Sequence, residues 1–90
     1  MTEALTKQRK RLRFRSWHRG MKELDLLLGS FADQHLERFD TGQLARFEAL
    51  LEAPEPALYA WLVSRTAPPA ELRDDVMELL LEFRYRPPAR

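Results

Sequence analysis

Hydrophobic positions along the chain recur with the i, i+3, i+4, i+7 spacing of helices, and no stretch alternates with period two for long enough to make a convincing strand. The spacing predicts five helices. They cover about residues 3–16, about 20–38, a segment from Asp40 to the prolines at 54 and 56, about 55–65, and about 69–84. We therefore expect an all-α fold, a compact five-helix bundle. It forms a single domain over residues 1–90, with residues 1–8 and 85–90 as flexible ends.

Each predicted helix has an apolar stripe that needs a core to face. The inward residues are Leu5, Leu12 and Phe14 in the first helix; Leu24, Leu27, Leu28, Phe31 and Leu36 in the second; Leu44, Phe47, Leu50 and Leu51 in the third; Leu58, Trp61 and Leu62 in the fourth; and Leu72, Val76, Leu79, Leu80 and Phe83 in the fifth. Asp40 and Gln43 have the spacing of a capping box. Gly29 lies inside the second helix, which is explicable if a neighbouring helix crosses closely there.

The net charge of +1 hides a marked asymmetry. Residues 1–19 hold seven basic residues and one acidic residue, a charge of +6, whereas the rest of the chain carries −5. Such a split suggests a basic N-terminal arm that meets something anionic, either nucleic acid, membrane phosphate or an acidic protein surface. The alternate arginines do not form one helical stripe, so electrostatics alone would give weak and salt-sensitive binding to nucleic acid.

The composition offers little for catalysis. The chain has no cysteine, and its two histidines, His18 and His35, lie in unrelated contexts. There is no phosphate-binding glycine loop and no serine triad with suitable spacing. No apolar run approaches the length of a membrane span, and the basic N-terminus has no adjacent apolar segment. These patterns favour a cytoplasmic protein that is not an enzyme and does not insert into membranes.

The segment Arg19-Gly20-Met21-Lys22-Glu23-Leu24-Asp25 joins the basic arm to the second helix. On one continuous helix, Arg19 and Glu23 would share a face, either as a docking surface or as a simple surface ion pair. Gly20 would let another surface approach the backbone, or let the chain turn. Trp17 beside this segment is equally compatible with a staple between two helices and with an exposed anchor for a partner.

This segment resembles the hallmark Arg-Gly-x-x-Glu of the succinate dehydrogenase assembly factor 2 family, the bacterial and mitochondrial flavinylation factors. The resemblance covers about residues 9–84. It includes Arg11-Leu12-x-Phe14-Arg15-Ser16, Leu27-Leu28-Gly29-Ser30-Phe31-Ala32, Phe47-x-x-Leu50-Leu51-Glu52, Leu58-Tyr59-x-Trp61 and Val76-Met77-x-Leu79-Leu80.

The resemblance implies an assembly factor that binds the flavoprotein subunit of succinate dehydrogenase, or of fumarate reductase in some bacteria. Such a factor promotes covalent attachment of FAD to a histidine of that subunit, so FAD belongs to the client and no cofactor is bound stably by the factor. It also implies a bacterial cytoplasmic location, or the mitochondrial matrix for a eukaryotic source, although no transit peptide is evident. We expect a monomer when the chain is free. The expected partner-binding residues are Arg15, Trp17, Arg19, Gly20, Met21, Glu23 and Asp25.

Three alternatives remain at this stage. The first is a small nucleic-acid-binding helical protein that uses the basic N-terminal arm. A toxin–antitoxin component would need a nuclease constellation or a dimer-forming strand, and neither is found in the sequence. An enzyme that binds FAD by itself would be yellow when purified.

Overall fold

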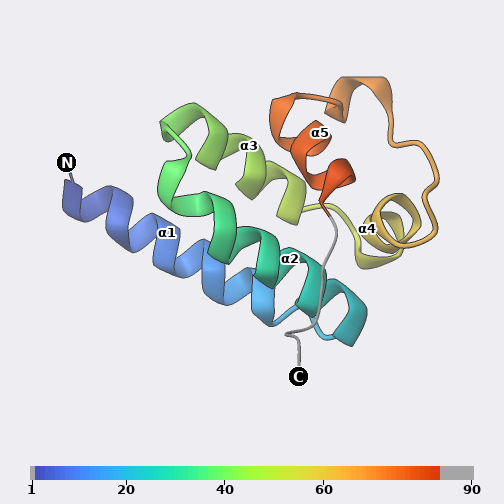
Figure 1. Ribbon diagram of the computed structural model, residues 1–90, viewed down its shortest axis with the longest axis horizontal. Helices are drawn as coiled ribbons and strands as arrows, with labels where there is room; N and C mark the ends of the chain where they lie inside the picture. The colour runs from blue at the N-terminus through green and yellow to red at the C-terminus, as the bar shows by residue number, and fades with distance from the viewer. Residues whose placement is uncertain (1, 84–90) are drawn as a thin grey trace.

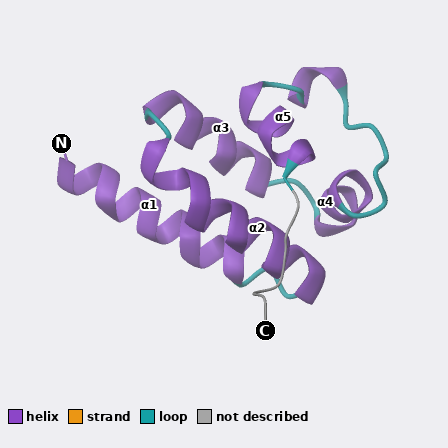
Figure 2. Cartoon of the chain, viewed as in Figure 1, coloured by secondary structure: helices purple, strands orange, loops and turns teal. Residues whose placement is uncertain are grey.

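The computed structural model describes residues 2–83, and this part of the chain is helical without any β-strand (Figure 2). The all-α prediction is confirmed. Residues 2–8, expected as a flexible end, form the first turns of a helix, whereas residues 85–90 lie outside the described part. In chain order the elements are α1 (Thr2–Trp17), α2 (Lys22–His35), the 3-10 turn η1 (Leu36–Arg38), α3 (Thr41–Leu51), α4 (Glu55–Leu62), the 3-10 turn η2 (Ala70–Leu72) and α5 (Asp75–Glu82).

The helices α1 and α2 form an antiparallel hairpin along one side of the molecule (Figure 1). Helix α3 packs on α1 and on α5, and α4 contacts both α2 and α5. None of the helices in residues 2–83 combines the length and the apolar character needed to cross a bilayer.

The core lies where the faces of these helices meet, and its residues largely match the predicted stripes. In α1 the fully buried hydrophobic side chain is Leu12. Phe14 was wrongly placed in the core: it is 63% exposed, because it lies two residues, or about 200° of helix, from Leu12. The buried side chains of the other α-helices are Leu24, Leu28, Phe31 and Ala32; Leu44, Phe47, Leu50 and Leu51; Leu58 and Leu62; and Val76, Met77 and Leu80.

Side-chain caps decide where two helices begin. The capping box at α3 is confirmed: Asp40 accepts from the Gln43 amide at 2.8 Å, and Gln43 accepts from the Asp40 amide at 3.1 Å. The prediction that the fifth helix starts near residue 69 is wrong. Asp74 accepts a hydrogen bond from the amide of Met77 at 2.9 Å, which makes it the N-cap, so α5 begins only at Asp75.

The second and fourth helices are also shorter than predicted. Gly20 has φ +105°, which a right-handed helix cannot contain, so α2 begins at Lys22. Helix α4 ends at Leu62, and Arg65, which takes a positive φ of 67°, cannot belong to it. At the other end of α2 the chain tightens into η1, where Arg9 donates hydrogen bonds to the carbonyl oxygens of Leu36 at 2.7 Å and Phe39 at 2.9 Å.

His35 at the end of α2 lies in an aromatic cluster. Its ring centroid is 4.5 Å from that of Phe31, 5.9 Å from that of Phe39 and 6.3 Å from that of Phe83. Desolvation by this packing, and secondarily the positive charge of Arg38, lower the pKa of His35 below its ordinary 6.5.

The lowered pKa of His35 predicts that the protein becomes less stable as the pH falls. As pH falls through about 6.5 the unfolded chain binds a proton at His35 before the folded chain does, so the free energy of unfolding decreases. The decrease from this residue stops once the folded state is protonated as well. Urea midpoints measured between pH 7.5 and pH 5 should therefore fall less for His35→Gln than for the wild type. Equal falls in both proteins would contradict the assignment.

Candidate partner-binding site

The link between α1 and α2 is a tight turn that is held by one carboxylate. Asp25 accepts hydrogen bonds from the amide of Arg19 at 2.7 Å and from the amide of Gly20 at 3.3 Å. The amide of Asp25 in turn donates to the carbonyl of Met21 at 2.8 Å. Of the two roles considered for Gly20, the positive φ supports the turn, since an L side chain rarely adopts that conformation. Asp25 therefore stabilises the backbone of the site.

Arg19 points into the molecule and joins this turn to the end of α3. Its guanidinium donates to the carbonyl oxygens of Leu51 at 2.6 Å and Ala53 at 3.2 Å, while its Nε is buried without a hydrogen-bond partner. The interpretation of Arg19 and Glu23 as neighbours on a continuous helix is wrong, because the turn at Gly20 separates them. The two terminal nitrogens of the Arg19 guanidinium therefore make a forked contact with carbonyl oxygens of the same chain.

Glu23 is the charged hallmark residue whose side chain is exposed to solvent. It lies exposed in the first turn of α2, and its carboxylate has no hydrogen bond or ion pair with any described residue. Met21, the N-cap residue of α2, is half-buried against the core. Gly20 is exposed, and the atom nearest to a Cβ placed on it would be a carboxylate oxygen of Glu55 at 3.8 Å. The accessible surface of the turn is therefore the backbone at Gly20 and the carboxylate of Glu23, which has no partner among residues 2–83.

Trp17 is half-buried and acts as a staple between α1 and α2. Its indole Nε1 donates to the carboxylate of Asp33 at 3.3 Å, and its ring lies against Gly29. A Cβ on Gly29 would lie under 3.0 Å from the ring atoms of Trp17, which real contacts do not show. The expectation that Gly29 accommodates a closely crossing helix is thus confirmed.

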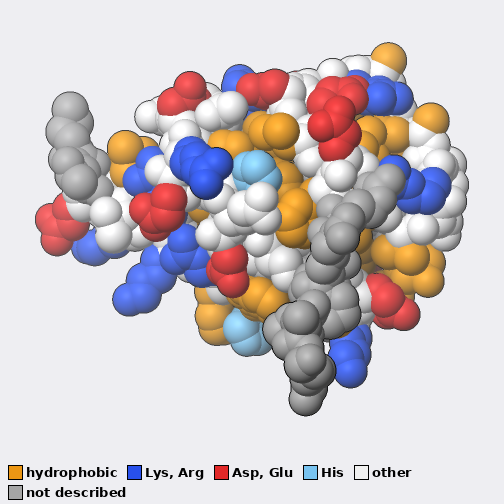
Figure 3. All heavy atoms as spheres, in the orientation of Figure 1, with side chains coloured by type: hydrophobic (Ala, Val, Ile, Leu, Met, Phe, Trp, Pro, Cys, Tyr) orange, Lys and Arg blue, Asp and Glu red, His pale blue; other side chains and the backbone are white. Residues whose placement is uncertain are grey.

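Three of the seven basic residues in the arm, Arg11, Arg13 and Arg15, pair with acidic residues of the same chain. Arg13 lies 3.2 Å from Asp33 and 3.3 Å from Glu37. Arg15 lies 3.0 Å from Glu52 and 3.7 Å from Glu48, and Arg11 pairs with Glu48 at 3.5 Å. Figure 3 shows blue and red side chains intermixed at the end of the molecule where α1 begins. The anionic surface that the arm meets is therefore that of α2 and α3, and nothing supports the nucleic-acid alternative.

An exposed aromatic pair at the C-terminal end of α1 was missed by the sequence reasoning. The rings of Phe14 and His18 are stacked, with centroids 4.0 Å apart and planes 21° from parallel. The Nδ1 atom of His18 lies 2.7 Å from the carbonyl oxygen of Phe14. Together with Arg15 and Arg19 they line a surface hollow of about 180 Å³. The i, i+4 spacing of Phe14 and His18, on the side opposite Leu12, was the signal that could have found it.

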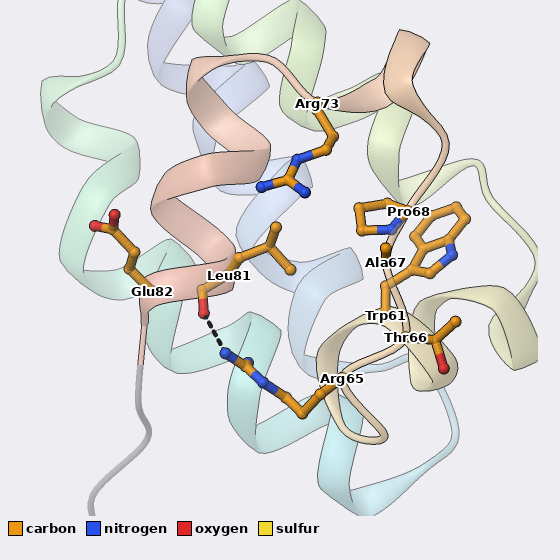
Figure 4. Close-up of a pocket in the computed structure, with 8 residues that line it drawn as sticks. All are labelled: Trp61, Arg65, Thr66, Ala67, Pro68, Arg73, Leu81 and Glu82. Carbon is orange, nitrogen blue, oxygen red and sulfur yellow. Dashed lines mark hydrogen bonds between the residues drawn. The ribbon is translucent and has the colours of Figure 1, made fainter.

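A second hollow of about 340 Å³ lies between α4 and α5 (Figure 4). Its two guanidinium groups already have acceptors, since Arg65 donates to the carbonyl of Leu81 at 3.1 Å and Arg73 pairs with Glu78 at 2.7 Å. In residues 2–83 no three His, Cys, Asp or Glu side chains are grouped so that they could hold a metal ion. The turn at Gly20 therefore remains the candidate site.

Residues 10–84 match the family model described as flavinator of succinate dehydrogenase. The chain belongs to this family. It is 37% identical over 76 residues to the mitochondrial succinate dehydrogenase assembly factor 2 of Dictyostelium discoideum, covering 84% of this chain and 54% of that protein. It is 35% identical over 78 residues to the FAD assembly factor SdhE of Acetobacter pasteurianus, covering 87% of this chain and 72% of that protein.

A second bacterial relative is the FAD assembly factor SdhE of Legionella pneumophila, 45% identical over 58 residues, which are 64% of this chain and 73% of that protein. The chain thus spans about half the length of the Dictyostelium relative and more of the bacterial ones. No solved structure matches it. In this member of the flavinator family, Arg19 and Asp25 organise the turn from within, and Glu23 is presented outward.

Proposed function

We propose that this chain is an assembly factor that binds the flavoprotein subunit of succinate dehydrogenase and promotes covalent attachment of FAD to that subunit. The proposal includes the flavoprotein subunit of fumarate reductase as a second client, that is, a second protein to which FAD is attached in the same way. Membership of the flavinator family supports this proposal, together with the exposed Glu23 beside a braced turn. The factor acts as a monomer in the bacterial cytoplasm, or in the mitochondrial matrix for a eukaryotic source.

The proposed mechanism is differential binding. The turn is braced by Asp25 on one side and by the fork of Arg19 on the other, so it loses little conformational freedom when a partner binds. Glu23 offers a carboxylate to a cationic group of the client, and the open backbone at Gly20 permits close approach. Binding one arrangement of the flavoprotein more tightly shifts its population toward the state in which FAD reacts with its histidine.

In this proposal the bond to FAD forms entirely within the client. The factor contributes recognition and orientation, and it is neither an enzyme nor a flavin carrier. The purified protein is therefore expected to be colourless, without the visible absorbance of a bound flavin. A purified protein that retains stoichiometric FAD would contradict this part of the proposal.

Glu23→Gln is the variant that tests the proposed site. It keeps the shape of the side chain and removes the charge, so the free energy of unfolding should change by about 0.5 kcal/mol or less, because Glu23 is exposed and has no hydrogen bond or ion pair with any residue in the described range 2–83. In cells lacking the native protein, in-gel fluorescence of covalent flavin on the flavoprotein should rise with the wild type and much less with Glu23→Gln.

Glu71→Gln is the matched control, since Glu71 is an exposed acidic residue in η2, away from the turn. It should restore flavinylation as the wild type does. Full restoration by Glu23→Gln would reject Glu23 as a contact, and a large loss of its stability would make Glu23 structural. Gly20 is a poorer probe, because any side chain at φ +105° strains the backbone.

A further inference from the structure

The stacked rings of Phe14, on α1, and His18, directly after α1, form a preorganised aromatic surface. Phe14 is the large hydrophobic side chain that residues 2–83 leave exposed, at 63%. The stack fixes its orientation, with ring centroids 4.0 Å apart, and the contact of His18 Nδ1 with the Phe14 carbonyl holds the second ring in place. Exposed aromatic side chains held in a defined orientation are typical of anchors in protein interfaces.

Folding does not account for this pair. Leu12 and Ser16 are the buried residues of α1, and Phe14 and His18 lie on the opposite side of the helix. Trp17 rather than Phe14 connects α1 to α2, through Asp33 and Gly29. The ring of Phe14 therefore contributes little to the core.

The hollow beside the two rings is suited to a carboxylate. Of its four lining residues, Arg15 and Arg19 are cationic, His18 is an imidazole and none is acidic. The side chain of Arg15 is 31% exposed and pairs with Glu52 and Glu48, whereas the guanidinium of Arg19 donates only to the backbone carbonyl oxygens of Leu51 and Ala53. The hollow therefore carries a positive charge at Arg19 that no ion pair among residues 2–83 neutralises. A carboxylate at this position would meet positive charge beside an aromatic floor.

We propose that Phe14 and His18 anchor the client flavoprotein, with an apolar client side chain on the rings and an adjacent client carboxylate toward Arg15 and Arg19. This inference rests on the proposed function and extends its contact surface along α1. Arg19 belongs to both the hollow and the turn at Gly20, so the two surfaces are continuous. Phe14 supplies apolar contact, and Glu23 supplies charge on the other side of the turn.

Binding of the purified flavoprotein subunit to the full chain, measured as Kd by calorimetry, tests the proposal. Phe14→Ala should weaken binding by about tenfold or more, and His18→Ala by several-fold, because both remove the stacked surface. Neither variant should lower Tm by more than about 2 °C, since Phe14 is exposed. Lys10→Ala, an exposed residue elsewhere on α1, is the control and should bind within about twofold of the wild type.

Binding by Glu23→Gln, Phe14→Ala and the wild type separates the aromatic anchor from the proposed function. If Glu23→Gln weakens binding while Phe14→Ala binds as the wild type does, the anchor is rejected and the proposed function stands. If the wild type does not bind the flavoprotein, the proposed function fails first. A photoreactive phenylalanine derivative placed at position 14 should capture a client peptide with an Asp or Glu beside an apolar residue, and a captured peptide without an acidic residue would overturn the assigned chemistry.

Discussion

Replacement of Arg19 by alanine is expected to lower the free energy of unfolding by about 3 kcal/mol, since a hydrogen bond from a charged group contributes about 1.5–3 kcal/mol and Arg19 makes two. The carbonyl oxygens of Leu51 and Ala53 would lose their donor at the end of α3. For a chain of this size, Tm should fall by on the order of 10 °C. The stability of Arg19→Lys should lie between those of the wild type and Arg19→Ala, because an ammonium group cannot reproduce the planar two-donor contact of a guanidinium.

Thermal and urea denaturation followed by circular dichroism would measure these changes, with Glu23→Gln as the stable counterpart. The two hallmark residues should then differ in kind: Arg19→Ala loses stability, and Glu23→Gln loses flavinylation at unchanged stability. Wild-type stability of Arg19→Ala together with lost client binding would instead show that Arg19 contacts the client directly. The hydrogen bonds to Leu51 and Ala53 would then be of minor energetic value.

Gly29→Ala should destabilise the protein by about 2 kcal/mol, although alanine is the better helix former by up to about 1 kcal/mol. The added methyl group would meet the ring of Trp17, which is itself held by Asp33. Gly42→Ala is the matched control: the nearest atoms are the flexible guanidinium of Arg46 at 3.3 Å and the Asp40 carboxylate at 3.5 Å. It should stabilise the protein by about 0.5 kcal/mol.

A double-mutant cycle measures whether Trp17 is the cause. In a Trp17→Ala background the space above Gly29 is open, so Gly29→Ala should become neutral or stabilising by up to about 1 kcal/mol. Urea unfolding of the four proteins provides the coupling energy. An unchanged penalty in the Trp17→Ala background would mean that another neighbour limits Gly29.

Several features followed from the sequence because they depend on residues close together in the chain. The capping box of Asp40 and Gln43 spans three residues, and the apolar stripe of α3 follows one helical period. Errors arose where a local signal had two outcomes. Gly20 was compatible with helix or turn, and the structure selects the turn. The fifth helix was predicted to start near residue 69, whereas the cap formed by Asp74 starts it at Asp75.

The sequence by itself determined that the chain is helical, which faces of most helices are buried, and which segment carries the family hallmark, because periodicity, caps and motif spacing are local. Only the tertiary structure decided how the charges are used. The acceptors of Arg19 lie 32 and 34 residues away and the Arg15–Glu52 pair is separated by 37 residues, so no local pattern reports them. Packing of α1 against α2 and α3 placed Arg11, Arg13 and Arg15 in ion pairs and turned Arg19 inward, while it left Glu23 and Phe14 on the surface.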